Sequence, residues 1–417
     1  MHQLSITLIG EVKSPKAYLI RDFLQRNGFA FQWIEVTTDA EARQYAGLDS
    51  RSDPRFPVLA LKDRILYAPT FPDIVAALDL SVGPQLPEYD LAIYGAGPAG
   101  LSAAVYGASE GLRTILVERF SIGGQAGSTS RIENYLGFPE GISGADLASR
   151  AREQAIRLGA EILLAAEGVG GSIEQGKMIG VLDSGKTVTS RATICATGVE
   201  YVRLNVLNEE RFLGRGLYYG AGSSEANLCR DHVFVVGGGN SAGQAALHMA
   251  SRVPKVTMLV RGNSLKDTLS HYLVDRIRLS PNIEVRTRCT LVAVDGDQTL
   301  ERITYRDLEH DEETEEVTSW LFVCIGGTPR TEWTDADMLV RDAAGYILTG
   351  SDLLNGASGT PWPLKRNPYP METSLPGIFA AGDIRAKSIK RCATAVGEGA
   401  AAVSFVHQFL AHEASVL

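Results

Sequence analysis

Residues Asp90–Glu118 read DLAIYGAGPAGLSAAVYGASEGLRTILVE, and this stretch predicts the fold of most of the chain. A short apolar run, Leu91–Tyr94, leads directly into the glycine motif Gly95-x-Gly97-x-x-Gly100. A helix of small residues follows, and Thr114–Val117 is a second β-rich run that ends at Glu118. Strand, glycine turn, helix and strand in this order predict a βαβ unit that binds a dinucleotide.

Each part of this motif has a physical role in such a unit. Gly95 makes the tight turn, Gly97 lets the backbone approach a pyrophosphate, and Gly100 allows the helix to pack closely. The N-terminus of the helix offers free N–H groups and the positive end of its dipole. Glu118, roughly 20 residues after the glycines, is placed to accept hydrogen bonds from a ribose 2′-hydroxyl.

Length and charge narrow the class of protein. The 417 residues predict two or three domains, and 45% hydrophobic with 21% charged residues is ordinary for a globular protein. A net charge of −9 argues against nucleic acid or an anionic membrane as the main partner. There is no apolar run of roughly 18 residues and no basic region before a signal core, so we expect a cytoplasmic protein.

The cysteine pattern suits a reducing compartment and predicts no metal site. The number of cysteines is odd, and no two of them form a close pair. Cys195 lies inside an apolar strand, so we expect a buried structural thiol there. The five are Cys195, Cys229, Cys289, Cys324 and Cys392.

The first 82 residues predict a separate α/β domain, followed by a linker at residues 83–88 that is rich in glycine and proline. Its strands and helices alternate in the order βαβ, αββα. The predicted elements are strand Leu4–Ile9, helix Pro15–Asn27, strand Phe31–Val36, helix Asp39–Ala46, strands Val58–Leu61 and Ile65–Ala68, and helix Phe71–Leu78.

This order, with Phe56-Pro57 just before the third strand, resembles the thioredoxin or glutaredoxin fold, in which that proline is cis. A redox-active member carries Cys-x-x-Cys where the first strand turns into the first helix, because the helix N-terminus lowers the thiol pKa. Here the turn reads Ser14-Pro15-Lys16-Ala17, and no cysteine precedes Cys195. We therefore expect a docking or dimerisation module that cannot perform disulfide chemistry by itself.

A second glycine cluster predicts a second nucleotide site. Val233–Val236 leads into GGGNSAG, residues 237–243, which opens an alanine-rich helix. The next strand, Val256–Val260, ends in Arg261 where the first unit has an acid. An arginine can bind a 2′-phosphate, so the sequence favours NADPH, with NADH as the alternative.

From Asp90 to the C-terminus, the chain resembles the low-molecular-weight thioredoxin reductase family of FAD-dependent pyridine nucleotide oxidoreductases. The resemblance implies an α/β fold of two nested Rossmann-like domains: residues 89–205 and 329–417 bind FAD, and residues 206–328 bind NAD(P)H. The motifs that carry it are Gly95–Gly100, Gly123-Gly124-Gln125, Glu133-Asn134, Ala196-Thr197-Gly198, Gly237–Ala242 and Ala381-Gly382-Asp383.

The resemblance also implies the residues of both sites. Asn134 and Cys392 would lie near the flavin ring, and the helix that starts at Cys392 would direct its N-terminus at the flavin, where negative charge develops on reduction. The FAD residues would be Gly95, Gly97, Ala99, Gly100, Glu118, Arg119, Gly124, Gln125, Asn134, Val169, Thr197, Gly198, Gly382, Asp383, Cys392 and Ala393. The NADPH residues would be Gly237, Gly239, Asn240, Ser241, Ala242, Arg261, Lys266 and Gly326.

One departure from the family bears on function. Thioredoxin reductases carry a Cys-x-x-Cys shortly before the second glycine cluster, whereas this chain has Gly220 and Ser223 at those two positions. Cys229 lies six residues too late and has no partner. The double-arginine motif for the 2′-phosphate is also reduced to Arg261, with Lys266 as a second cation. No residue is therefore predicted with certainty to be catalytic.

Two function classes follow. The first is an NADPH-dependent flavoprotein, a homodimer by resemblance, that passes electrons through FAD to an external acceptor such as a ferredoxin-like protein, a disulfide or a quinone. The second is a flavin-binding sensor or scaffold with a degenerate NADPH site, or a protein with two flavins, in which the N-terminal domain docks a partner. The long segment Ser351–Thr373 would cap the flavin or a partner site, or would be a surface excursion.

Overall fold

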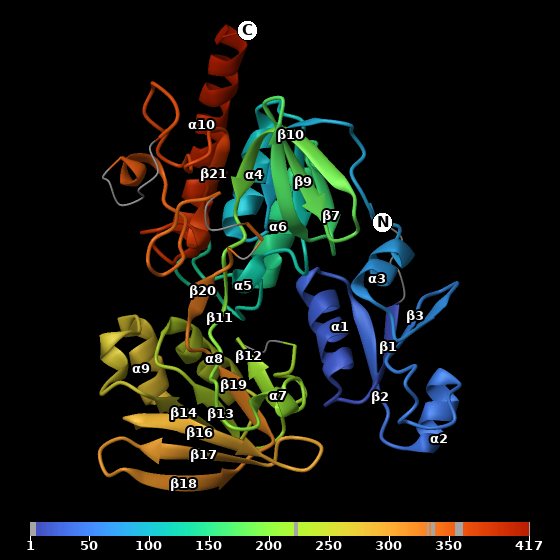
Figure 1. The fold of residues 1–417 in the computed structure, drawn as a ribbon. Helices are drawn as coiled ribbons and strands as arrows, with labels where there is room; N and C mark the ends of the chain where they lie inside the picture. The colour runs from blue at the N-terminus through green and yellow to red at the C-terminus, as the bar shows by residue number, and fades with distance from the viewer. Residues whose placement is uncertain (1–5, 221–223, 332, 335–337, 355–361, 417) are drawn as a thin grey trace. The chain divides into compact units, whose positions relative to one another are not determined.

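The computed structural model describes residues 6–220, 224–331, 333–334, 338–354 and 362–416 (Figure 1). The chain divides into two compact units. The first unit combines Met1–Thr70, Ser128–Arg131 and Tyr201–Gly327. The second combines Phe71–Gly127, Ile132–Glu200 and Thr328–Leu417.

The N-terminal part of the first unit has a four-stranded sheet in the order β2-β1-β3-β4. Strands β1 and β2 are parallel, whereas β3 and β4 are antiparallel to their neighbours. The predicted order of elements up to Tyr67 is confirmed, and the Phe56–Pro57 peptide bond is cis. The elements are β1 (Ile6–Gly10), α1 (Pro15–Arg26), β2 (Phe31–Glu35), α2 (Asp39–Glu41), a π-helical turn (Ala42–Ala46), β3 (Val58–Ala60) and β4 (Ile65–Tyr67).

Helix α1 begins and ends where its sequence predicts. The Ser14 side chain caps it by accepting a hydrogen bond from the backbone N–H of Ala17, and Pro15 occupies the first turn, where no N–H is needed. Gly28 follows the helix with a φ of 74°, a conformation that glycine adopts without strain. The apolar face of the helix is buried and includes Phe23 and Leu24.

The rest of the first unit is a nucleotide-binding part with an all-parallel sheet in the order β12-β19-β13-β14-β15. An antiparallel three-stranded sheet, β16-β17-β18, follows β15 and was not predicted as a unit from the sequence (Figure 1). The elements are α7 (Glu209–Phe212), β12 (Leu217–Tyr219), β13 (Val233–Val236), α8 (Asn240–Ala250), β14 (Val256–Val260), a 3₁₀ turn (Leu265–Asp267), α9 (His271–Leu279), β15 (Ile283–Thr287), β16 (Cys289–Asp295), β17 (Arg302–Asp307), β18 (Glu312–Val317) and β19 (Trp320–Val323).

The second unit has a seven-stranded sheet in the order β7-β6-β5-β10-β9-β8, and β21 pairs with β10 from the distant end of the chain. The elements are α3 (Phe71–Ala77), β5 (Tyr89–Tyr94), α4 (Pro98–Ser109), β6 (Thr114–Glu118), α5 (Gly124–Gly127), α6 (Gly144–Arg157), β7 (Glu161–Leu164), β8 (Gly168–Glu174), β9 (Lys177–Leu182), β10 (Thr187–Cys195), 3₁₀ turns (Gly350–Leu353 and Gly382–Ile384), β21 (Ile378–Ala380) and α10 (Cys392–Val416).

Strands β5, β6, β7, β10 and β21 run parallel, so their carboxyl ends meet at one edge of the sheet, where a dinucleotide is expected to bind. Strand β21 is shorter than predicted: it ends at Ala380, and Gly382 and Asp383 belong to the 3₁₀ turn. Two short strands that lie where the chain passes from one unit to the other, β11 (Val199–Tyr201) and β20 (Gly327–Pro329), pair with each other. Among the helices of the described residues, none is long and apolar enough to cross a membrane.

Candidate functional site

The first glycine motif forms a tight turn that leads into helix α4. Gly95 has a φ of 102°, and a side chain there would overlap the Ala196 carbonyl. A side chain at Gly100 would overlap the carbonyl oxygen of Gly95, so the helix packs against the turn through backbone alone. Gly97 is the N-cap of α4, and a methyl group there would meet no described atom within 4 Å apart from its neighbours in the chain. The open space therefore lies at a helix N-terminus, where N–H groups are free to bind an anion.

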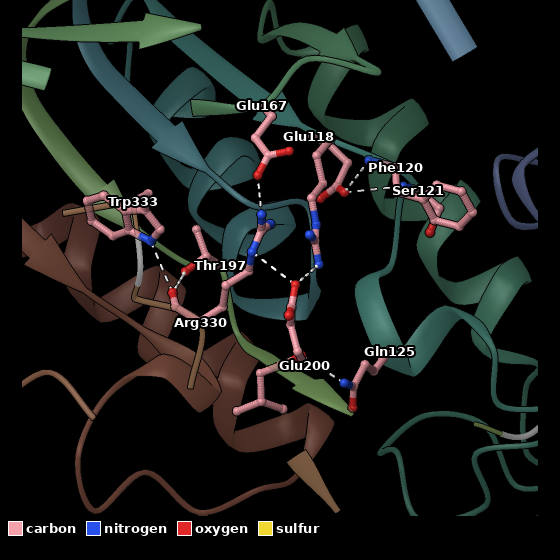
Figure 2. A network of polar contacts seen from close by, with 11 residues as sticks. Glu118, Phe120, Ser121, Gln125, Glu167, Thr197, Glu200, Arg330 and Trp333 are labelled. Carbon is pink, nitrogen blue, oxygen red and sulfur yellow. Dashed lines mark hydrogen bonds and ion pairs between the residues drawn. The ribbon is translucent and has the colours of Figure 1, made fainter. Parts of the chain in front are cut away.

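Glu118 is buried and organises the loops around this turn. One of its oxygens accepts a hydrogen bond from Ala96 N at 2.7 Å. The other accepts from Phe120 N at 2.9 Å and from Ser121 N at 3.2 Å (Figure 2). An ionised carboxylate has about four acceptor positions, so one remains for a ribose hydroxyl. Glu118 therefore holds the backbone of the surrounding loops, a role that the sequence did not predict. One acceptor position is still available for the predicted hydrogen bond to a ribose hydroxyl.

Arg119 belongs to a chain of ion pairs that links the strand ends of the second unit. Its guanidinium lies 2.6 Å from Glu200, and Glu200 also lies 3.0 Å from Arg330. Figure 2 shows the Arg330 guanidinium between Glu200 and Glu167, its second acidic partner. The Arg330 carbonyl accepts hydrogen bonds from Thr197 Oγ1 at 3.1 Å and from the Trp333 indole at 3.0 Å.

The surroundings of the other residues predicted for the FAD-binding half differ. The Gln125 side chain donates to the carbonyl of Val199 at 2.7 Å, so it braces β11 (Figure 2). Gly124 has a φ of 53°, and the Cβ of any side chain there would lie 3.1 Å from the Cα of Gly97. Asn134 and Val169 are exposed, Gly198 is half-buried with a φ of 68°, and Ala99 is buried.

A buried glutamate on α10 fixes the Gly382-Asp383 turn. Glu398 accepts a hydrogen bond from Gly382 N at 2.7 Å and pairs with Arg385 at 2.6 Å. Burial raises the pKa of Asp383, and Lys390 acts in the opposite direction. Glu398 was missed in the sequence analysis, although a single acid within a run of alanine and glycine residues was a usable signal.

Helix α10 begins at Cys392, as predicted, with Ala393 exposed in its first turn. Burial raises the pKa of the Cys392 thiol, and the neighbouring Asp383 carboxylate acts in the same direction. The thiolate is the reactive form of cysteine, so this environment favours an unreactive thiol.

The second glycine cluster repeats the arrangement of the first. Gly237 has a φ of 140°, and a side chain there would overlap the Cys324 carbonyl. Gly239 is the N-cap of α8, and a methyl group there would again meet no described atom within 4 Å apart from its neighbours in the chain. Asn240 is held by Ser270, whose backbone N–H donates to the Asn240 side chain at 2.7 Å. Ser241 is exposed and Ala242 is buried, as the first turn of a packed helix requires.

The cations predicted for a 2′-phosphate are exposed at the end of β14. Arg261 and Lys266 both face solvent, and Gly326 is exposed with a φ of 101°. Arg288, missed in the sequence analysis, joins this region: its backbone N–H donates to Gly262 O at 3.1 Å, and its guanidinium pairs with Glu309 at 2.6 Å.

Tyr201 occupies the side-chain space at Gly220, the first of the two positions where the family has cysteine. A side chain at Gly220 would overlap the hydroxyl of Tyr201, and Gly220 has a φ of 88°. The remaining residues of that position, including Ser223, lie outside the described residues. Cys229 is fully buried, and its Sγ contacts the Glu225 carbonyl at 3.4 Å. Burial raises the pKa of Cys229 strongly, so it does not replace the missing pair.

Cys195, Cys289 and Cys324 are also buried. The buried environment predicted for Cys195 is confirmed.

Comparison with known proteins agrees with this geometry. Residues 89–399 match the pyridine nucleotide-disulphide oxidoreductase family. Thioredoxin reductase from Treponema pallidum is 34% identical over 316 residues, which is 76% of this chain and 95% of the relative. The bifunctional thioredoxin reductase/thioredoxin of Mycobacterium leprae is 33% identical over 327 residues, 78% of this chain and 67% of that protein. The crystal structure of Lactococcus lactis thioredoxin reductase superposes with a TM-score of 0.69 at 29% identity, covering 78% of this chain and 99% of that one.

These matches bear out the resemblance read from the sequence, and the family implies binding of FAD and NAD(P)H. They cover the two Rossmann-like sheets and leave the likeness of the N-terminal sheet to thioredoxin a prediction. The chain belongs to the pyridine nucleotide-disulphide oxidoreductase family and is a thioredoxin reductase-like FAD- and NAD(P)H-dependent oxidoreductase.

Proposed function

We propose that the chain passes electrons from NADPH, through FAD, to an acceptor outside the chain. The observation that carries this proposal is the pair of helix N-termini with open space, at Gly97 and Gly239, combined with Tyr201 in the place of a cysteine side chain at Gly220. When bound, FAD supplies the hydride-accepting chemistry, so the protein needs only to hold and orient its two nucleotides.

The residues around Gly97 support a role in holding FAD. The free N–H groups of α4 would bind the pyrophosphate, and Glu118 would use its remaining acceptor position on a ribose hydroxyl. Glu398 holds the Gly382-Asp383 turn in place, which would keep Asp383 on the ribityl chain. The N-terminus of α10 would stabilise negative charge on the reduced cofactor.

NADPH is proposed over NADH because no carboxylate stands at the end of β14. Arg261 takes that position, and Lys266 adds a second exposed cation nearby in the chain. A 2′-phosphate is a dianion that arginine binds through paired hydrogen bonds, whereas a carboxylate would repel it.

The acceptor is proposed to be a ferredoxin-like protein, a disulfide on a small molecule or a quinone. A dithiol relay within the chain would need two cysteines near residues 220–223, and the sequence has none there. Reduction of thioredoxin itself is therefore not expected.

A steady-state acceptor panel tests the proposal. Purified protein with bound FAD is mixed with NADPH or NADH and with ferredoxin, flavodoxin, oxidised thioredoxin, a small disulfide or a quinone. We expect sustained oxidation of NADPH with at least one acceptor, a slower rate with NADH, and no turnover of thioredoxin. Turnover of thioredoxin, or no turnover with any acceptor, would contradict the proposal. The latter result would favour the sensor or scaffold.

A further inference from the structure

The N-terminal module, defined here as residues 6–70, is joined to the nucleotide-binding part, residues 201–327, by a buried ion pair. The guanidinium of Arg21 on α1 lies 3.1 Å from both carboxylate oxygens of Glu225. The two side chains are 3% and 0% exposed. Arg21 is further held by the Val12 carbonyl at 2.7 Å and lies over the Trp33 ring at 4.4 Å.

Apolar contacts surround this ion pair. Tyr18 meets the ring of Tyr218 edge-on, with centroids 4.9 Å apart. Val12 and Tyr18 pack against the hydrophobic core of the nucleotide-binding part, which includes Tyr218 and Trp320. A side chain at Gly214 would overlap the backbone of Pro15, so the two backbones approach closely there. The module thus shares a core with the nucleotide-binding part.

The contact surface includes residues next to two positions that stand out in the sequence. In the module, the turn that would carry Cys-x-x-Cys in a thioredoxin-like protein is Ser14–Ala17, and Pro15 and Tyr18 lie in the interface. In the nucleotide-binding part the cysteine position begins at Gly220, and Glu225 lies just beyond it. Thiol–disulfide exchange requires direct contact between sulfur atoms, so a disulfide-carrying partner would have to approach this same surface.

We propose that the N-terminal module occupies, within the same chain, the surface that a disulfide-carrying partner protein would need. The Arg21–Glu225 ion pair holds the module on this surface. The module then excludes such a partner and does not act as a mobile electron carrier. The docking is independent of the proposed function, whereas the exclusion of a partner rests on it.

Because the Arg21–Glu225 pair is charged and buried, the docking of the module is sensitive to single substitutions in it. Burial raises the pKa of Glu225, and the charge and hydrogen bonds of Arg21 oppose this effect. Removing one member of a buried ion pair leaves an uncompensated charge and is strongly destabilising, whereas replacing both members by apolar residues of similar volume is often neutral.

The test compares Arg21→Met, Glu225→Leu and the variant with both substitutions in the full chain, with Lys62→Met as the control. Lys62 belongs to the same module, but it is exposed and lies outside the turn Ser14–Ala17. For each single variant we expect hydrogen–deuterium exchange to rise at least about tenfold in both α1 and residues 213–219, with an apparent Tm lower by about 5 °C or more. The variant with both substitutions should recover protection in both segments, because no buried charge is left without its partner, and Lys62→Met should leave both unchanged.

Unchanged hydrogen–deuterium exchange in both segments of Arg21→Met would overturn the proposal, as would a variant with both substitutions whose segments stay unprotected. Where a single variant does not fold, the variant with both substitutions alone decides. Reduction of the flavin by NADPH is measured on the same samples. If NADPH does not reduce the flavin of the wild-type chain, the proposed function is refuted, but the docking is not.

Discussion

Gly97→Ala is expected to lower the affinity for FAD by at least about tenfold while the protein stays folded, a loss of about 1.4 kcal/mol of binding free energy. Apart from its neighbours in the chain, a methyl group at Gly97 meets no atom of the described residues within 4 Å, so the fold should accept it. It would occupy the space through which the backbone approaches a pyrophosphate. The measurement is FAD per chain, from the absorbance of released flavin, combined with the apparent Tm of the protein without cofactor.

Gly100→Ala is the matched comparison in the same helix. Its methyl group would overlap the Gly95 carbonyl, so the turn and the helix must move apart, at a cost of roughly 1–3 kcal/mol or more. We expect this variant to lose both FAD and stability, whereas Gly239→Ala should keep its FAD and lose affinity for NADPH. Full occupancy with FAD at unchanged affinity in Gly97→Ala would show that the cofactor does not use this turn.

Glu372→Ala is expected to lower the apparent free energy of unfolding of the FAD-binding unit by about 3 kcal/mol or more. Glu372 is fully buried and receives both guanidinium nitrogens of Arg366 at 2.7 Å. It also accepts hydrogen bonds from the backbone N–H groups of Tyr369 at 2.9 Å and Gly377 at 3.0 Å. The substitution therefore leaves one cation and two N–H groups without their acceptor, and urea denaturation measures the loss.

The control for this variant is Glu309→Ala, which removes an ion pair of similar length on the surface. Glu309 lies 2.6 Å from Arg288, and the two side chains are 54% and 44% exposed. An exposed pair contributes less than about 1 kcal/mol. If Glu372→Ala lowers the free energy of unfolding no more than Glu309→Ala does, Glu372 does not organise the segment that leads to β21.

The part of the predicted cap at residues 355–361 lies outside the described residues.

The sequence predicted those parts of the fold that depend on local patterns. The strands at Thr114–Glu118 and Val256–Val260 were located because β-branched residues stand between glycine or polar segments. Backbone geometry requires glycine at positions 95 and 100, so the motif alone predicted the tight turn and the close helix packing there.

Contacts between distant residues were not predictable in this way. Arg330 and Glu167 are 163 residues apart, and Arg21 and Glu225 are 204 apart, so no periodicity links them. The role of Glu118 in bracing Phe120 and Ser121 also requires knowledge of the loop path. The sheet β16-β17-β18 was missed although β17 alternates polar and apolar residues, because β18 has glutamate at four of its six positions and gives no strand pattern.

The absence of the cysteine pair shows what each source contributes. The sequence established that no two thiols stand near residues 220–223. The structure adds that Tyr201 occupies the side-chain space at Gly220, so a cysteine restored there alone would need the ring to move. The same region holds Glu225, the anchor of the N-terminal module.

The central claim is that NADPH reduces a flavin bound at the first glycine turn and that no thiol of the chain receives its electrons. The most direct measurement is an anaerobic titration of the FAD-loaded protein with NADPH, followed by the flavin absorbance, with free thiols counted before and after. We predict complete bleaching by about one equivalent of NADPH per FAD, with no change in the thiol count. A flavin that stays oxidised with excess NADPH, or a gain of two thiols per chain on reduction, would contradict the account.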